Sequence, residues 1–399
     1  MKAAQKHVIG IDIIRFCAAV MVMLFHLAYW SWAPADSLTR DVTGGIVQFP
    51  SLAPFIWPGW VGVEIFFVIS GFVIAYSASG ATPYAFFRSR VLRLYPAAWV
   101  CATATLVAVV LLRRAGYETI WQYVHSMALW VQGPWIDGVY WTLGIEITFY
   151  AVIFCVLCLG RFGSIPVVLG LMALASAAFW VGLAIDRLFP GMLPLAFLHD
   201  LLASPMAAFL LLRHGCFFAL GGLLWLCQTQ PLTRWRACLI ALCLLTGVIE
   251  VSDAARNVVM WIGDSTGRRI FVCAVWLGAV ACLAGTIFAN DALHRRFGRW
   301  ARVVKTVGLM TYPVYLLHDV IGAALLKAGV LLAMPPLAAL ALAMASILVL
   351  SWIVTKFLEP PIRSRLRQVL SPAAAAGIPT GYVPGPIPPS GESTFSIGD

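Results

Sequence analysis

Long apolar runs separated by short polar segments dominate this chain. Ten of these runs reach about 18 residues, which is the length a helix needs to cross the roughly 30 Å hydrocarbon core of a bilayer. They lie at approximately 9–30, 59–78, 95–113, 141–160, 164–185, 206–227, 234–251, 270–289, 307–331 and 335–357. The pattern therefore predicts an all-α fold, a polytopic transmembrane bundle of about ten helices.

Two segments depart from this pattern. Residues 120–132 are apolar and aromatic but too short to span, so we expect an interfacial or re-entrant helix there. Residues 371–399 are rich in Pro, Gly, Ala and Ser and cannot bury a core, which predicts a disordered cytoplasmic tail. The rest, residues 1–370, is expected to form one transmembrane domain.

The composition agrees with a membrane protein. Hydrophobic residues make up 61% of the 399 residues and charged residues 11%, whereas average soluble domains carry roughly a quarter charged residues. The principal partner of the chain is therefore expected to be the lipid bilayer. The net charge of +10 resides in short loops between apolar runs, which is typical of orientation signals, so we expect no nucleic-acid partner.

The placement of the 27 basic residues predicts the orientation. Most of them share one side if the N-terminus is cytoplasmic. These are Lys2, Lys6, Arg88, Arg90, Arg93, Arg161, Arg234, Arg236, Arg295, Arg296, Arg299, Arg302, Lys305, Lys356, Arg363, Arg365 and Arg367. Both termini are then expected on the cytoplasmic side, although Arg113–Arg114 and Arg268–Arg269 count against it.

The first apolar run, IGIDIIRFCAAVMVMLFHL, contains three ionisable groups. Asp12 and Arg15 are one helical turn apart and can pair, and His26 lies close to three turns beyond Arg15 on the same face, about 16 Å away. A charge in hydrocarbon costs several kcal/mol unless it is paired or faces a cavity. One interpretation is an anchoring pair with an interfacial histidine. The other is a site in which His26 is a general base.

Two carboxylates occupy other apolar runs. Glu64, in GWVGVEIFFVISGF, lies near the outer end of its run and suits either the headgroup region or a cavity. Glu146, in WTLGIEITFY, lies about one turn inside its run, where a carboxylate needs a partner or a wet pocket. The small pair Ser70–Gly71 predicts close helix approach.

A cluster of guanidinium groups follows the second run. Arg88, Arg90 and Arg93 lie in FFRSRVLRLYP, where Arg90 and Arg93 share one helical face. Forked guanidinium groups suit phosphate, which is one interpretation of the cluster. Plain anchoring at the cytoplasmic surface is the other.

Other polar groups indicate less. The pattern at His318, in TYPVYLLHD, favours a packed or interfacial histidine over a catalytic one. Cys155 and Cys158 form a CxxC inside an apolar run with no nearby Cys or His pair, so we expect no metal site.

In chain order these segments resemble the acyltransferase-3 family of integral membrane O-acyltransferases, over roughly residues 8 to 367. Arg15 and His26 match the Arg-x10-His pattern of its first helix, and GVEIFFVISGF is similar to its second-helix signature, with Glu64 where Asp is frequent. RVLRLYP resembles its Arg-x-x-Arg loop, WTLGIEITFY its Trp, Glu and Phe-Tyr helix, and YPVYLLH its late Tyr-Leu-Leu-His segment.

This resemblance implies acyl transfer, most commonly of an acetyl group, from a cytoplasmic acyl-CoA to a hydroxyl of a carbohydrate acceptor. Acyl-CoA would be a co-substrate, with no tightly bound cofactor, and the enzyme would reside in the cell inner membrane. Arg90 and Arg93, with Arg88, would hold the coenzyme A phosphates, and Arg15 would orient the donor. His26 would be the general base or a covalent acyl carrier. Glu146 or Glu64 would steady His26 or bind the sugar.

Alternatives remain open at this point. Transporters and flippases for a glycan or lipid-linked sugar also place charges in their spans, but they commonly show paired repeats and Gly/Pro-broken helices in matching positions, and this sequence shows neither. A glycosyl ligase or polymerase would be expected to have larger exterior loops. The sequence is compatible with a homo-oligomer and does not specify one.

Overall fold

The computed structural model describes residues 8–34, 37–112, 115–192, 194–259 and 262–371. Within these residues the regular structure is helical throughout and no strand occurs, which confirms the predicted all-α class. The predicted tail falls almost entirely outside the described residues.

Eight helices of the described chain are long and apolar enough to cross a membrane. They are α1 (Ile9–Phe25) with the π-helical turn η1 (His26–Trp30), α3 (Ala53–Ile56) with η2 (Trp57–Val61) and α4 (Gly62–Ala78), α5 (Pro83–Leu111), η3 (Gly138–Tyr140) with α7 (Trp141–Cys158), η4 (Phe162–Ser164) with α8 (Ile165–Leu188), α12 (Arg234–Val258), α13 (Thr266–Phe288), and α17 (Pro336–Ile353) with η7 (Val354–Leu358) and α18 (Glu359–Val369). The chain is therefore a multi-pass membrane protein.

Shorter helices complete the described fold. They are α2 (Leu38–Thr43), α6 (Tyr117–Ala128), α9 (Phe197–Ala203), α10 (Pro205–Phe209), α11 (Gly215–Thr229), α14 (Asn290–Phe297), η6 (Gly298–Trp300), α15 (Ala301–Leu317) and α16 (Val320–Leu331). Helix α6 is the short aromatic helix that the sequence predicts at 120–132.

Two of the ten predicted runs differ from single straight spans. The run 206–227 becomes the short helix α10, a turn, and α11, which begins only at Gly215. The run 307–331 is broken between α15 and α16, which are bent by 73° relative to each other. The break spans His318 and Asp319, the two polar residues in the middle of this apolar run.

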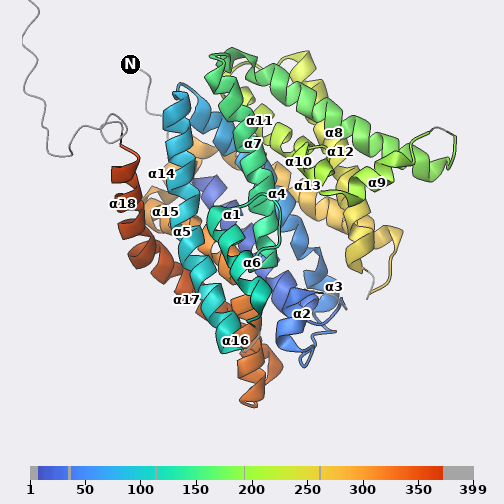
Figure 1. Ribbon diagram of the computed structural model, residues 1–399. Coiled ribbons are helices and arrows are strands. Elements are labelled where there is room, and N and C mark those ends of the chain that lie inside the picture. The colour runs from blue at the N-terminus through green and yellow to red at the C-terminus, as the bar shows by residue number, and fades with distance from the viewer. Residues whose placement is uncertain (1–7, 35–36, 113–114, 193, 260–261, 372–399) are drawn as a thin grey trace, which may run out of the picture.

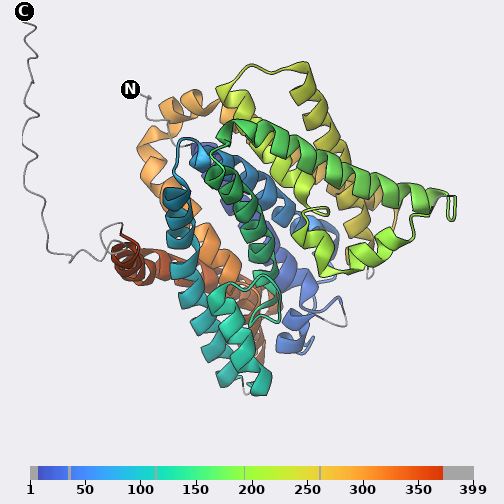
Figure 2. The same ribbon diagram turned by 45° about the horizontal axis from the view of Figure 1, so that its top comes forward.

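Helix α4 lies inside the bundle and is largely buried. In Figure 1, α5, α15 and α18 lie on one side of α1, α4 and α7, whereas α8, α9 and α12 lie on the other. Figure 2 shows the same order from a second direction. Glycines let α4 and α11 approach closely, because a Cβ on Gly71 would overlap the carbonyl oxygen of Phe218 and one on Gly221 that of Val68.

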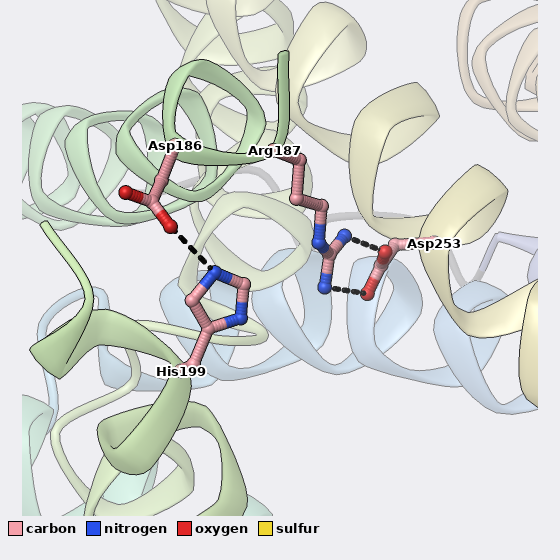
Figure 3. Close-up of polar contacts among 4 residues, drawn as sticks. All are labelled: Asp186, Arg187, His199 and Asp253. Carbon is pink, nitrogen blue, oxygen red and sulfur yellow. Dashed lines mark hydrogen bonds and ion pairs between the residues drawn. The ribbon is translucent and has the colours of Figure 1, made fainter. Parts of the chain in front are cut away.

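Polar side-chain contacts join α8, α9 and α12 (Figure 3). Asp186 and Arg187 lie near the end of α8. Nε2 of His199, on α9, is 3.0 Å from Oδ2 of Asp186, and the Arg187 guanidinium pairs with Asp253 on α12. These contacts fix α9 and α12 against the end of α8.

Candidate active site

A cavity of about 570 Å³ lies among α1, α4, α5, α7, α15 and α18. This volume falls within the roughly 300–1,000 Å³ of small-molecule sites. Lys305 and Tyr315 both line it and lie ten residues apart on α15, so the cavity extends about 15 Å along that helix. Its ionisable and hydroxyl-bearing lining residues are Asp12, Arg15, Ser70, Ser89, Arg90, Arg93, Thr142, Glu146, Tyr150, Lys305, Thr311, Tyr312, Tyr315, Arg363 and Arg367.

Cations predominate in this lining. Lys305 at the start of α15 and Arg363 and Arg367 on α18 converge with Arg90 and Arg93 of α5. The sequence assigns all five to the side with the basic loops, so segments far apart in the chain bring their positive charges to one end of the cavity. Such an end attracts a polyanion.

Aromatic rings hold two of these guanidinium groups in place. Cζ of Arg90 is 5.7 Å from the ring centre of Tyr150, and Cζ of Arg93 is 5.7 Å from that of Tyr312. Arginine stacks on aromatic faces while its N–H groups remain available for a ligand. Arg88 is placed differently, because it is absent from the cavity lining and donates a hydrogen bond of 3.1 Å to the backbone oxygen of Arg367.

Arg15 lies deeper, on the face of α1 that meets α15. Asp12 lines the same cavity and packs against Gly308, where a Cβ would overlap its carboxyl group. This close packing explains how two charged residues of α1 reach the cavity from within the bundle. Arg15 lies within electrostatic range of Asp12, Glu146 and Arg93.

Glu146 is the best-defined carboxylate of the cavity. Its Oε1 accepts hydrogen bonds of 2.7 Å from both Ser70 on α4 and Tyr150, one turn further along α7. These two donors fix the carboxylate in a single orientation and join α4 to α7. The predicted need of Glu146 for a polar partner at this depth is thus met by Ser70 and Tyr150, and Arg15 supplies a nearby opposite charge.

The end of the cavity remote from Lys305 is aromatic. Tyr315 lies edge-on to Phe66 of α4 at 5.7 Å between ring centres. Between this end and the basic end lies Tyr312, whose hydroxyl is buried and has no hydrogen-bond partner among the described residues. A buried hydroxyl that lines a cavity and lacks a partner is available to a ligand.

His26 and His318 lie beyond this end and do not belong to the cavity lining. His318 follows Tyr315 by one turn, and their ring centres are 5.5 Å apart. Nε2 of His318 is 3.2 Å from Nδ1 of His26, although 292 residues separate them in the chain. His318 is fully buried, whereas His26 is partly exposed. Arg15 and His26 thus lie on the same helix, but only Arg15 lines the cavity.

Glu64 lies in a second polar cluster, also outside the cavity lining. It is 4% exposed and faces the charges of Glu250 and Arg213. Glu250 is fully buried, and its Oε1 is 3.7 Å from Nδ1 of His214 and 3.8 Å from Nε of Arg213. Of the two predicted carboxylates, only Glu146 lies in the cavity with Arg15.

Sequence reasoning missed several members of this site. Ser70 and Tyr150 carry no distinctive signal alone, but Tyr150 lies four residues after Glu146, a spacing at which helical side chains meet. His318 is a candidate in the sequence, but its pattern favours packing, although the adjacent polar pair His318–Asp319 interrupts a long apolar run.

The arrangement combines a cationic end, a carboxylate, Glu146, within electrostatic range of Arg15, and a histidine pair next to the aromatic end. The sequence matches the acyltransferase-3 profile, described as an acyltransferase domain, over residues 8–356. Nodulation protein 10 of Rhizobium leguminosarum bv. viciae is 28% identical over 170 residues, which are 37% of this chain and 43% of that protein. The chain thus spans less than half of the curated relative it matches, and no solved structure matches it. Because the profile covers nearly the whole chain, the chain belongs to the acyltransferase-3 family of membrane acyltransferases.

Proposed function

We propose that the protein transfers an acyl group, most commonly acetyl, from acyl-CoA to a hydroxyl of a carbohydrate acceptor. The observation that carries this proposal is the cationic cavity, in which Arg90, Arg93, Lys305, Arg363 and Arg367 converge. Coenzyme A presents several phosphate charges, which guanidinium groups bind through paired hydrogen bonds. The positive-inside pattern supports a cytoplasmic position for this end, where acyl-CoA is made, as expected for an enzyme of the cell inner membrane.

The cavity length suits the donor. With the phosphates at the basic end, the pantetheine arm would run along α15 toward Tyr315. The cavity extends about 15 Å along this helix, which is comparable to the length of that arm. The thioester would then lie between Arg15 and the aromatic end, where Arg15 and the hydroxyl of Tyr312 are available to its carbonyl oxygen.

The chemical step requires one proton acceptor. The acceptor hydroxyl oxygen attacks the thioester carbonyl carbon while His26 takes the hydroxyl proton. The carbon–sulfur bond breaks, the leaving thiolate takes the proton from His26, and the products are an ester and coenzyme A thiol. The alternative route passes through a covalent acyl-His26 intermediate, which the acceptor hydroxyl then attacks. Neither route requires a metal ion, because a thioester is already activated. In either route Glu146 holds Arg15 through charge and does not touch His26.

One observation favours the transporter alternative. The chain is broken between α15 and α16, and transporters commonly form their substrate sites from discontinuous helices. Membership of an acyltransferase family favours the enzyme. Release of free thiol from acetyl-CoA by purified protein given a glycan acceptor separates the two, since a transporter releases none.

Donor binding is tested by removing the two stacked arginines together. We expect Arg90→Ala with Arg93→Ala to raise the dissociation constant for acetyl-CoA at least roughly tenfold in isothermal titration, since each lost charged hydrogen bond costs about 1.5–3 kcal/mol. Arg295→Ala with Arg296→Ala is the matched control, because it removes the same charge from exposed residues that do not line the cavity. Equal affinity of both double variants would return Arg90 and Arg93 to an anchoring role.

A further inference from the structure

Both histidines lie at irregular points of their helices. His26 is the first residue of η1, a π-helical turn that ends the first span, and His318 follows the last residue of α15 at the 73° break. Interrupted helices within a membrane must satisfy their freed backbone groups through other partners. Irregular turns of this kind are frequent at functional sites.

Buried polar groups hold the break in place. Asp137 is fully buried, and its Oδ1 and Oδ2 accept hydrogen bonds from the backbone N–H groups of Val139 and Val320, at 3.1 and 3.3 Å. Thr39, on α2, donates a hydrogen bond to Oδ1 of Asp319. Burial and the neighbouring Asp319 carboxylate raise the pKa of Asp137. The start of α16 is thus tied to two other segments, and His318 is fixed immediately before it.

The hydrogen bonds determine the tautomer of each histidine. Nδ1 of His318 is 2.7 Å from the carbonyl oxygen of Tyr315, so this nitrogen carries the proton and Nε2 is a bare acceptor in the neutral ring. Nδ1 of His26 is 2.9 Å from the carbonyl oxygen of Val22 and 3.2 Å from Nε2 of His318. Both neighbours are acceptors, so Nδ1 of His26 also carries a proton.

One proton arrangement therefore satisfies all three contacts of the neutral pair. His26 shares its Nδ1–H between the Val22 carbonyl and His318, which leaves Nε2 of His26 with a free lone pair. The ring centres are 4.7 Å apart at an interplanar angle of 75°, so the ring of His318 presents its nitrogen edge to His26 without stacking on it.

We propose that His318 is the positioning residue for His26, accepting its Nδ1–H so that Nε2 is the atom that receives the hydroxyl proton. When His26 takes that proton its charge is stabilised by two acceptors, the Val22 carbonyl and His318. A neutral histidine here fills the place that a carboxylate fills in a Ser-His-Asp triad. This inference rests on the proposed function, and it assigns a role to a residue whose sequence pattern favours simple packing.

The test compares two substitutions of His318. His318→Gln keeps an acceptor oxygen near the position of Nε2, whereas His318→Leu keeps bulk and removes the acceptor. We expect His318→Leu to lower kcat roughly 100-fold or more with an unchanged KM for acetyl-CoA, because His318 lies outside the cavity. His318→Gln should recover at least about tenfold of that loss. His199→Leu, at the outer edge of the fold, should leave kcat unchanged.

The outcomes separate the inference from the proposed function. A kcat for His318→Leu within about twofold of wild type would overturn the positioning role while leaving the acyltransferase reaction in place. Equal inactivity of the Leu and Gln variants, with normal acetyl-CoA binding, would also overturn it. If wild-type protein releases no thiol at all, the proposed function fails instead.

A spectroscopic measurement tests the inference even where the His318 variants do not fold or no reaction is observed. Imidazole ¹⁵N spectra of wild-type protein, assigned through His26→Gln, report which nitrogen of His26 is protonated without any turnover. A protonated Nδ1 and a bare Nε2 support the inference. The opposite tautomer overturns it.

Discussion

Single residues define this site through the partners they meet. The sequence identifies Arg15, Glu146, Arg90 and Arg93, because a charge inside or beside an apolar run requires a cavity, a partner or a surface. All four line one cavity. Sequence spacing on a single helix places residues well, since helical geometry fixes which side chains share a face.

Contacts between helices could not be predicted in this way. The contact between His26 and His318 joins residues 292 positions apart. Whether Glu64 faces the cavity or the cluster with Glu250 depends on how α4 is rotated. Two carboxylates that both lie in apolar runs thus have different surroundings. The sequence alone does not distinguish the surroundings of these two carboxylates, because they depend on helix packing.

Glu146 provides a test at this scale. Glu146→Gln keeps the size of the side chain and an acceptor for Ser70 and Tyr150 but removes the charge near Arg15. We expect thiol release to fall roughly tenfold or more, since one transition-state hydrogen bond to a charged group contributes about 1.5–3 kcal/mol. Glu118→Gln, on the exposed face of α6, should have wild-type activity. Full activity of Glu146→Gln would exclude a role for its charge.

At the scale of elements, the apolar pattern locates helices more reliably than their interruptions. The run 307–331 satisfies the length and hydropathy of one span, yet α15 ends at Leu317 because Asp137 and Thr39 supply partners for a broken backbone. Those partners lie on other segments. Tertiary contacts therefore determine three features that the hydrophobic periodicity cannot predict: the break, the π-helical turn at His26 and the late start of α11.

Helix packing gives a second test. Gly221→Ala places a methyl group against the Val68 carbonyl oxygen, so we expect unfolding in detergent at lower temperature, with a loss of about 1–3 kcal/mol for an overpacked core. Gly278→Ala on α13 meets nothing within 4 Å and should be neutral or slightly stabilising. Equal unfolding temperatures for the two variants would mean that α4 and α11 are not in close contact.

At the scale of the whole molecule, the bundle brings the basic ends of α5, α15 and α18 to one end of a cavity and the two histidines beyond the other. The proposed donor would enter at the basic end, and the proposed acceptor hydroxyl would meet His26, which is partly exposed. The fold class and the membrane location follow from composition and hydropathy alone. The relation between the cavity and the base does not, because it depends on Tyr315, which lines the cavity and contacts His318.

The most direct measurement is ester formation by purified protein, comparing wild type with His26→Ala. Acetyl-CoA and a glycan with free hydroxyl groups would be supplied in detergent, and thiol release and acetylated product would be followed together by absorbance and mass spectrometry. We predict that wild type forms ester and thiol in equal amounts, whereas His26→Ala binds acetyl-CoA normally and loses at least roughly 100-fold in rate. Ester formation by His26→Ala at the wild-type rate would contradict the account.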